Sequence, residues 1–163
     1  MSYGVRVLRH TSGFLTVIHP AMNDRGRPPG VSNGLWARRC LDLTIAKHPE
    51  WQGFESADLL SDTLPSRRFR DAWRLVVCQV TEDLAACRAI RLAEVRRDRD
   101  ARMPQFDAEW LKATGQGDAA RAAAVEARRQ ALRDVPQVAA PALAACTTPA
   151  KIAAFTPAWP ELP

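Results

Sequence analysis

The sequence has no long hydrophobic run. A helix that crosses a membrane needs roughly 20 consecutive apolar residues, and no stretch of this 163-residue chain comes near that length. The opening stretch, MSYGVRVLRH, also lacks the apolar centre of a secretory signal peptide. We therefore expect a protein that is synthesised in the cytoplasm and does not associate with a membrane.

The spacing of the cysteines is unlike that of a metal site. The chain has four cysteines without a C-x-x-C pair, and its three histidines lie far from them in sequence. Zinc sites usually draw on closely spaced pairs of such ligands, so we expect no metal. Proteins made in a reducing compartment rarely form disulfides, and we expect free thiols that serve mostly as small buried residues: Cys40, Cys78, Cys87 and Cys146.

Patterns that carry catalysis or bind a cofactor are also missing. No glycine-rich phosphate loop occurs, and GQG at residues 115–117 is interpreted as a turn. No nucleophile has an evident base beside it, and no pair of carboxylates is placed for acid and base work. The histidines are expected at the surface or at element ends: His10, His19 and His48. We expect a protein that is not an enzyme and needs no cofactor.

The sequence is rich in arginine, and the ratio of basic to acidic residues differs between its two halves. The chain carries 23 basic and 18 acidic residues, a net charge of +5. Residues 1–80 hold 11 basic and 7 acidic side chains, whereas residues 81–136 hold 11 and 10. Because a nucleic-acid surface depends on uncompensated Lys and Arg, we expect the charges of the second region to pair with one another.

The pattern of apolar residues and turn signals predicts an α+β fold in three parts. These are a small α+β module over residues 1–80, an antiparallel helical hairpin over 81–136, and an irregular Pro- and Ala-rich tail over 137–163, in which a short helix spans 149–155.

The N-terminal module is predicted to hold about three strands. Residues 5–9 and 14–18 are apolar, β-branched runs separated by a loop with Gly13, which favours a β-hairpin. Residues 75–80 predict one further strand against that hairpin, and 51–64 contain a short strand.

One amphipathic helix completes this module. It follows an exposed loop at residues 23–30, begins with Ser32 or Asn33 as its cap, and ends at His48 and Pro49. Its apolar face is expected at the residues that recur with helical spacing: Leu35, Trp36, Cys40 and Leu43.

The hairpin is predicted from its capping residues. Thr81 caps the first helix, Pro104 bends it without ending it, Asp118 caps the second helix, and Pro136 ends that helix. The apolar stripe of the first helix is interrupted over residues 96–102.

Two kinds of contact are expected to sustain the hairpin. In the interrupted stripe, Arg96 with Asp100 and Asp98 with Arg102 stand four residues apart and are expected to form ion pairs. On the second helix, Val125 and Leu132 stand beside a stripe of small residues expected to allow close packing: Ala120, Ala124, Ala127 and Ala131.

The stretch RRFRDAWR at residues 67–74 has two interpretations. Four arginines interleaved with Phe69 and Trp73 are typical of a surface that binds single-stranded nucleic acid. Alternatively, the two aromatic residues enter the core and the arginines coat the surface, which is the interpretation we favour.

The remaining large aromatics are candidates for protein contacts, because such residues often anchor interfaces. Trp110 and Trp159 lie on thin elements, and each either packs back on the chain or binds a partner. The full set of candidate interface residues is Phe69, Trp73, Arg96, Arg99, Phe106, Trp110, Phe155 and Trp159.

Five stretches resemble small proteins encoded among tail or other virion genes of tailed bacteriophages and prophages. They are IHPA (18–21), LPSRRFRDAWR (64–74), IRLAEVRRDRDARMPQFDAEWLKA (90–113), QALRDVP (130–136) and TPAKIAAF (148–155). The helical part also resembles phage tail assembly chaperones. The resemblance covers most of the chain and implies no catalytic residue.

The resemblance implies a non-enzymatic structural protein of the virion, at the tail or a fibre attachment point. Its expected partners are other virion proteins of the tail, fibre or portal region, and we expect several symmetric copies. An assembly chaperone that leaves the particle is the first alternative. A nucleic-acid-binding or host-directed regulatory protein that uses the arginines of residues 67–74 is the second.

Overall fold

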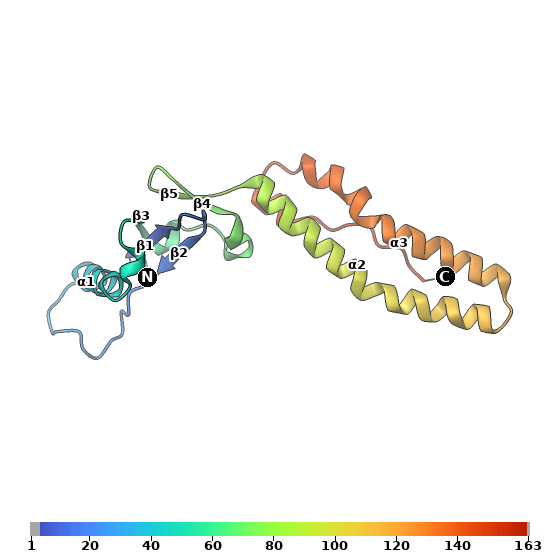
Figure 1. Ribbon diagram of the computed structural model, residues 1–163, viewed down its shortest axis with the longest axis horizontal. Helices are drawn as coiled ribbons and strands as arrows, with labels where there is room; N and C mark the ends of the chain where they lie inside the picture. The colour runs from blue at the N-terminus through green and yellow to red at the C-terminus, as the bar shows by residue number, and fades with distance from the viewer. Residues whose placement is uncertain (1–3, 163) are drawn as a thin grey trace. The chain divides into compact units, whose positions relative to one another are not determined.

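The structure is a computed structural model that describes residues 4–162. It divides into two compact units, one that ends at Asp83 and one that begins at Leu84 (Figure 1). The first, the N-terminal unit, holds strands and one helix, and the second, the helical unit, holds three helices. The predicted α+β fold is confirmed.

The N-terminal unit contains five strands, one α-helix and three short 3-10 helices. In chain order they are β1 (Gly4–Arg9), β2 (Leu15–Ile18), α1 (Asn33–Ala46), η1 (Pro49–Trp51), β3 (Glu55–Leu60), η2 (Ser61–Thr63), η3 (Arg67–Ala72), β4 (Trp73–Val76) and β5 (Gln79–Glu82).

A three-stranded antiparallel sheet, in the order β2-β1-β3, forms the centre of this unit. The predicted hairpin and the predicted strand within residues 51–64 are both present. Gly13 adopts a φ of +86° in the hairpin loop, a conformation that side chains with a Cβ rarely adopt. The central strand alternates, so Val5 and Val7 are fully buried while Arg6 lies on the opposite face.

Arg6 joins three elements on that face. Its Nε donates to Asp58, which stands opposite it on β3, at 2.6 Å, and its Nη1 donates to Asp42 of α1 at 2.8 Å. The hydrogen bond from Arg6 to Asp58 favours the charged carboxylate and lowers the pKa of Asp58. The sheet and the helix are therefore tied together by one guanidinium.

The predicted single strand over residues 75–80 is wrong. β4 and β5 form a second, two-stranded antiparallel sheet, with Val76 paired to Gln79. Val77 and Cys78 form the two-residue turn between them, with φ values of 46° and 61°. The apolar run hides the turn because neither residue is a typical turn former. Trp73 and Leu75 of β4 pack with Val7 of β1 in one core. The interpretation that Trp73 is a core residue is confirmed.

Helix α1 begins as predicted, and of its predicted apolar face Trp36 is buried and Cys40 partly buried, whereas the two leucines are not. The hydroxyl of Ser32 accepts from the Leu35 backbone N–H. Leu35 and Leu43 are 68% and 51% exposed, whereas Trp36, Ala37 and Leu41 are buried. The indole N–H of Trp36 donates to the carbonyl of Ala21 at 2.9 Å, which orients the helix about this side chain.

The helical unit consists of two long antiparallel helices and a short third one. They are α2 (Leu84–Gly115), α3 (Ala119–Ala145) and α4 (Pro149–Ala154). The carboxylate of Asp118 accepts from the Arg121 N–H at 2.9 Å and caps α3 as predicted. Pro104 lies inside α2 without ending it, and Figure 1 shows the helix changing direction between its green and yellow parts.

Two predicted boundaries of the hairpin are wrong. Thr81 is not a helix cap, because it is paired with Arg74 in the β4-β5 sheet, and the unit boundary therefore lies after Asp83 and not after residue 80. Pro136 does not end the second helix, which continues to Ala145. A proline inside a helix removes one backbone hydrogen bond, and here Pro136 is buried in the packed face, which offsets that loss.

The predicted irregular tail over 137–163 is wrong in its first part, because residues 137–145 belong to α3, but its short helix begins as predicted. The Thr148 hydroxyl accepts from the Lys151 N–H at 3.2 Å, Pro149 opens α4, and Ile152 is fully buried. The helix ends at Ala154 with Phe155 as its cap, one residue short of the prediction, and residues 155–162 have no regular structure.

The cysteines of the chain are free thiols. Cys87 is buried and Cys40 and Cys146 are partly so, but Cys78 is exposed in the β4-β5 turn, against the expectation of a buried residue. Among residues 4–162, no helix combines the length and apolarity that a bilayer span requires.

The β4-β5 turn supports a test of backbone strain. Replacing Val77 by Asn and Cys78 by Gly introduces the pair that two-residue hairpins with positive φ prefer. We expect the double variant to raise the free energy of unfolding of the N-terminal unit by about 1–2 kcal/mol, since a left-handed conformation is costly for a side chain with a Cβ. Thermal unfolding followed at the Trp73 indole resonance measures the change.

Val76→Asn is the matched control, because Val76 is exposed in the regular part of β4. It is expected to bring no gain. An unfolding temperature of the double variant at or below that of the unmodified chain would contradict strain in this turn.

Candidate binding surfaces

A small apolar cluster joins α2 to α3. Val95 and Phe106 of α2 pack against Leu132 and Val135 of α3, with Met103 and Trp159 at the margin. The predicted stripe of small residues is not the packing face, because Ala120, Ala124, Ala127 and Ala131 are exposed. Branched side chains bury more apolar area than a methyl group, so the helices meet through the larger residues.

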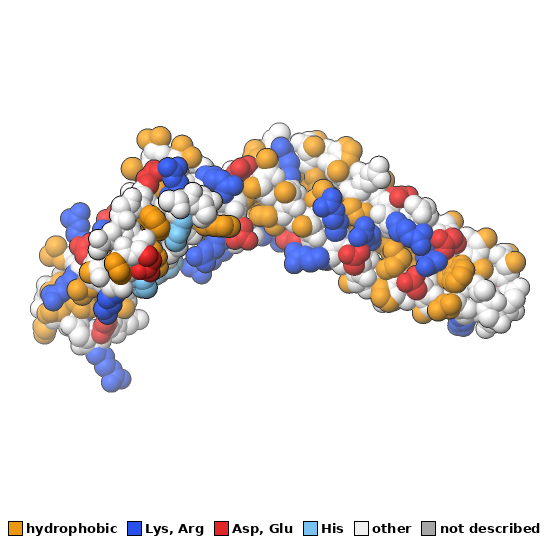
Figure 2. Space-filling model, in the orientation of Figure 1, with side chains coloured by type: hydrophobic (Ala, Val, Ile, Leu, Met, Phe, Trp, Pro, Cys, Tyr) orange, Lys and Arg blue, Asp and Glu red, His pale blue; other side chains and the backbone are white. Residues whose placement is uncertain are grey.

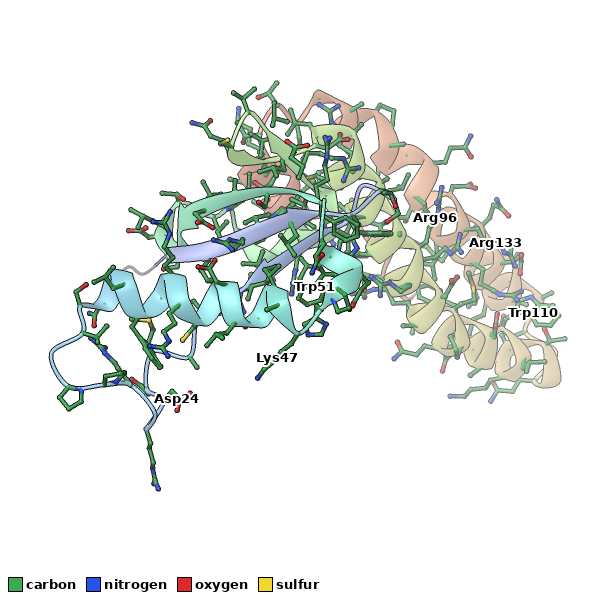
Figure 3. All side chains as sticks on the ribbon, turned by 60° about the vertical axis from the view of Figure 1, so that its left-hand side comes forward. Asp24, Lys47, Trp51, Arg96, Trp110 and Arg133 are labelled. Carbon is green, nitrogen blue, oxygen red and sulfur yellow. The ribbon has the colours of Figure 1, made fainter. Side chains whose placement is uncertain are left out.

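The predicted ion pairs along α2 do not form. Within the described part of the chain, neither Arg96 with Asp100 nor Asp98 with Arg102 makes an ion pair. Asp100 instead bonds its neighbour Arg99 at 2.7 Å. Arg96 is exposed and carries its charge into solvent (Figure 3).

Charges do pair between the two helices, beyond the interrupted stripe. Arg121 of α3 bonds Glu109 of α2 at 2.7 Å, and Arg129 of α3 bonds Asp107 of α2 at 2.6 Å. The guanidinium of Arg129 also lies over the ring of Trp110, 5.2 Å from its centroid. Basic and acidic side chains are interspersed along the face of this unit in Figure 2.

Glu126 extends this network along α3. Its carboxylate accepts from Arg133 at 3.0 Å and from Arg129. The hydrogen bond from Arg133, then that from Arg129, lowers the pKa of Glu126. Figure 3 labels Arg133 and Trp110 on this unit.

Two arginines of α2 bind the ends of the C-terminal helices. Arg88 donates from Nη2 to the carbonyl of Cys146, the cap residue of α3, at 2.7 Å. Arg91 donates from Nη2 and Nε to the carbonyl of Phe155, the cap residue of α4, at 2.8 and 3.2 Å. Positive charge at a helix C-terminus complements the unpaired carbonyls and the helix dipole there.

A third arginine of α2 holds the tail itself. The guanidinium of Arg102 lies 4.6 Å from the centroid of the Trp159 ring. Since Trp159 also contacts the α2–α3 cluster, it packs on its own chain. Trp159 therefore packs on the chain's own helices, which is the first of its two interpretations.

The tail and α3 together form an apolar groove, which we call the tail groove. Its volume is about 440 Å³, and it is lined by residues 155–160 of the tail and by five residues of α3: Ala131, Val135, Val138, Ala139 and Ala142. No lining residue is ionisable. Val138 is 74% exposed, which is a high exposure for an apolar side chain within a helix.

The candidate interface residues therefore fall into different places. Phe69 and Trp73 are 1% and 2% exposed in the core of the N-terminal unit, so neither offers a face on which a base could stack. Phe106 is buried between the helices, and Phe155 and Trp159 line the tail groove.

A second concave site lies in the N-terminal unit, at the arginine-rich stretch. Arg67 donates from Nη2 to Nε2 of His19 at 3.4 Å. Burial, then the charges of Arg67 and Arg70, lowers the pKa of His19. We call the cavity that these three residues share with Val17, Leu64 and Trp73 the arginine pocket.

Sequence reasoning missed the two arginines that hold the ends of α3 and α4 and the histidine of the arginine pocket. Arg88 and Arg91 bind backbone carbonyls 58 and 64 residues away, and a carbonyl acceptor leaves no trace in a sequence. His19 was interpreted as a surface residue, and its only signal was the position just after a predicted strand.

The contact between Arg91 and Phe155 gives a test of the tail. Arg91→Met keeps the aliphatic stem and removes the guanidinium. We expect a loss of about 1–3 kcal/mol in the free energy of unfolding, the cost of a hydrogen bond that involves a charged group, and faster hydrogen exchange over residues 155–162. Exchange mass spectrometry of the full chain measures the second effect.

Arg97→Met is the control, because Arg97 is exposed on the same helix. It should leave exchange in the tail unchanged. Equal protection of residues 155–162 in both variants would show that Arg91 does not hold the tail.

The lowered pKa of Glu126 predicts an acid dependence. The carboxylate form is favoured in the folded state, so its contribution is complete above the unfolded pKa, near 4.5, and is lost as the pH falls through the lower folded pKa. We expect the unfolding temperature of Glu126→Gln to fall less than that of the unmodified chain between about pH 5 and pH 3. Glu161→Gln, at an exposed tail residue, should keep the original slope; identical slopes in all three proteins would contradict the prediction.

Comparison with known proteins identifies no relative of this chain. No protein-family model, curated protein or solved structure matches the chain. The functional assignment therefore depends on the two surfaces and on the sequence resemblance.

Proposed function

We propose that this chain is a non-enzymatic structural protein of a bacteriophage particle, located at the tail or at a fibre attachment point, which acts by binding other virion proteins. The observation that carries the binding role is the tail groove. Proton transfer requires an ionisable group, and the groove has none. An apolar concave surface of about 440 Å³ instead suits an apolar segment of a partner protein.

The groove is ordered before any partner arrives. Arg88, Arg91 and Arg102 hold the ends of α3 and α4 and the ring of Trp159 on the helical unit. A preformed surface spares the partner complex the entropy of ordering the tail. This preorganisation supports a role as a stable attachment surface.

The assignment to a phage particle comes from the resemblance of five stretches to virion-gene products. The runner-up, a tail or fibre assembly chaperone, would use the same groove and then leave the particle. In either role the chain would bind another virion protein, so the two roles differ only in whether the chain stays in the particle after assembly.

The test is the presence of the chain in mature particles of the phage that encodes it. We expect mass spectrometry of purified virions to detect the protein, and Val138→Arg to reduce its incorporation by tenfold or more, because a charge in the groove must be desolvated when the partner binds.

Leu111→Arg is the matched control, since Leu111 is 63% exposed on α2 and does not line the groove. It should be incorporated normally. Absence of the unmodified protein from virions overturns the structural role and favours the chaperone, whereas normal incorporation of Val138→Arg overturns the role of the groove.

A further inference from the structure

The arginine pocket differs from the tail groove in its charge. It has a volume of about 170 Å³, and its lining combines apolar residues with two arginines and a histidine but no acidic residue: Val17, His19, Leu64, Arg67, Arg70 and Trp73. His19 follows directly on β2, while both arginines belong to η3. The elements of the N-terminal unit thus bring the two arginines beside a histidine that lies 48 residues from Arg67 in sequence.

The two arginines of the pocket lack a carboxylate partner. Among the described residues, no Asp or Glu oxygen lies within 4.0 Å of the guanidinium of Arg67 or Arg70. The neighbouring Arg74 is engaged, because it pairs with Asp83 at 3.7 Å and donates to the carbonyl of Trp73 at 3.0 Å. Arg68 lies over the ring of Phe69, 5.7 Å from its centroid. Two of the four arginines in this stretch therefore remain for a ligand.

His19 is neutral and does not change the net charge of the pocket. It accepts the hydrogen bond from Arg67 through Nε2, so this nitrogen carries no proton. Partial burial, and then the neighbouring guanidinium groups, favour the neutral ring and lower the pKa of His19. The pocket is left with two positive charges close together, an arrangement that a bound anion stabilises.

The composition of the pocket separates the possible anions. A nucleic acid gains affinity from a row of cations along its phosphates, and here only two are available. Its bases would also need an exposed aromatic face, and Trp73 is 2% exposed. A carboxylate matches the planar fork of a guanidinium with two parallel hydrogen bonds, and an aliphatic group beside it would lie against Val17 and Leu64.

We propose that the arginine pocket binds a single carboxylate group of a partner protein, from an Asp or Glu side chain or a C-terminus that follows an aliphatic residue. Arg67 and Arg70 donate to the carboxylate, and the apolar wall of the pocket contacts the neighbouring side chain. The site lies in the N-terminal unit and shares no residue with the tail groove, so it holds or fails independently of the proposed virion role.

The probe is isovalerate, which places a carboxylate beside a branched aliphatic group. Titrated into the full chain and followed by NMR, it is expected to shift the ring resonances of His19 and the indole resonance of Trp73 in a saturable manner. Isovaleramide has the same shape without the charge and should produce no saturable shift.

Three variants identify the groups responsible. Arg67→Gln and Arg70→Gln should each weaken isovalerate binding by about tenfold or more, the usual effect of losing a hydrogen bond from a charged donor. Arg39→Gln is the control, because Arg39 is exposed on α1 of the same unit, and it should bind as the unmodified chain does. Unchanged dispersion of the amide spectrum shows that each variant is folded.

The outcomes are distinct. Saturable binding of isovalerate that both pocket variants lose and Arg39→Gln keeps supports the proposal. Equal binding of isovaleramide, or binding that survives both pocket variants, overturns it. Inorganic phosphate or a single-stranded thymidine oligonucleotide that binds tenfold more tightly than isovalerate also overturns it, since the site would then be one for phosphate.

Discussion

The helical unit depends on the contacts by which α2 holds the C-terminal segment. Two long helices with a narrow apolar cluster leave much of their surface open to water. Arg88 and Arg91 bind the carbonyls at the ends of α3 and α4, and Arg102 lies over Trp159. Arg88 and Arg91 are charged donors to carbonyls at helix ends, and such hydrogen bonds are stronger than those between neutral groups.

The same principle recurs in the N-terminal unit. Arg6 joins β1 to β3 and to α1, much as Arg129 joins α3 to α2. Arginine suits this role because its guanidinium has several donors in a rigid plane and remains charged when partly buried. Against this background, Arg67 and Arg70 stand apart, since their pocket brings no acidic residue to them. Some arginines of the chain thus hold its own elements together, whereas Arg67 and Arg70 line a pocket without an acidic partner.

The two candidate surfaces differed in how far sequence could find them. Trp159 and Phe155 were recognisable as large aromatics in a proline-rich tail, and both line the tail groove. The groove itself was not predictable, because it exists only where the tail lies along α3. Likewise, the arginine-rich stretch was evident, but which arginines remain unpaired depends on Asp83 and on His19, residues brought near by the fold.

The sequence by itself determined the features set by neighbouring residues. Ser32, Asp118 and Thr148 each cap the helix that follows them, as their side chains and position require. Only the tertiary structure decided that Pro136 lies inside a helix, that Val77 occupies a turn, and which residues join α2 to α3. The physical reason is that a capping hydrogen bond joins residues a few positions apart in sequence. Which helix face is buried, and where the backbone accepts strain, depends instead on the apolar area buried against distant segments.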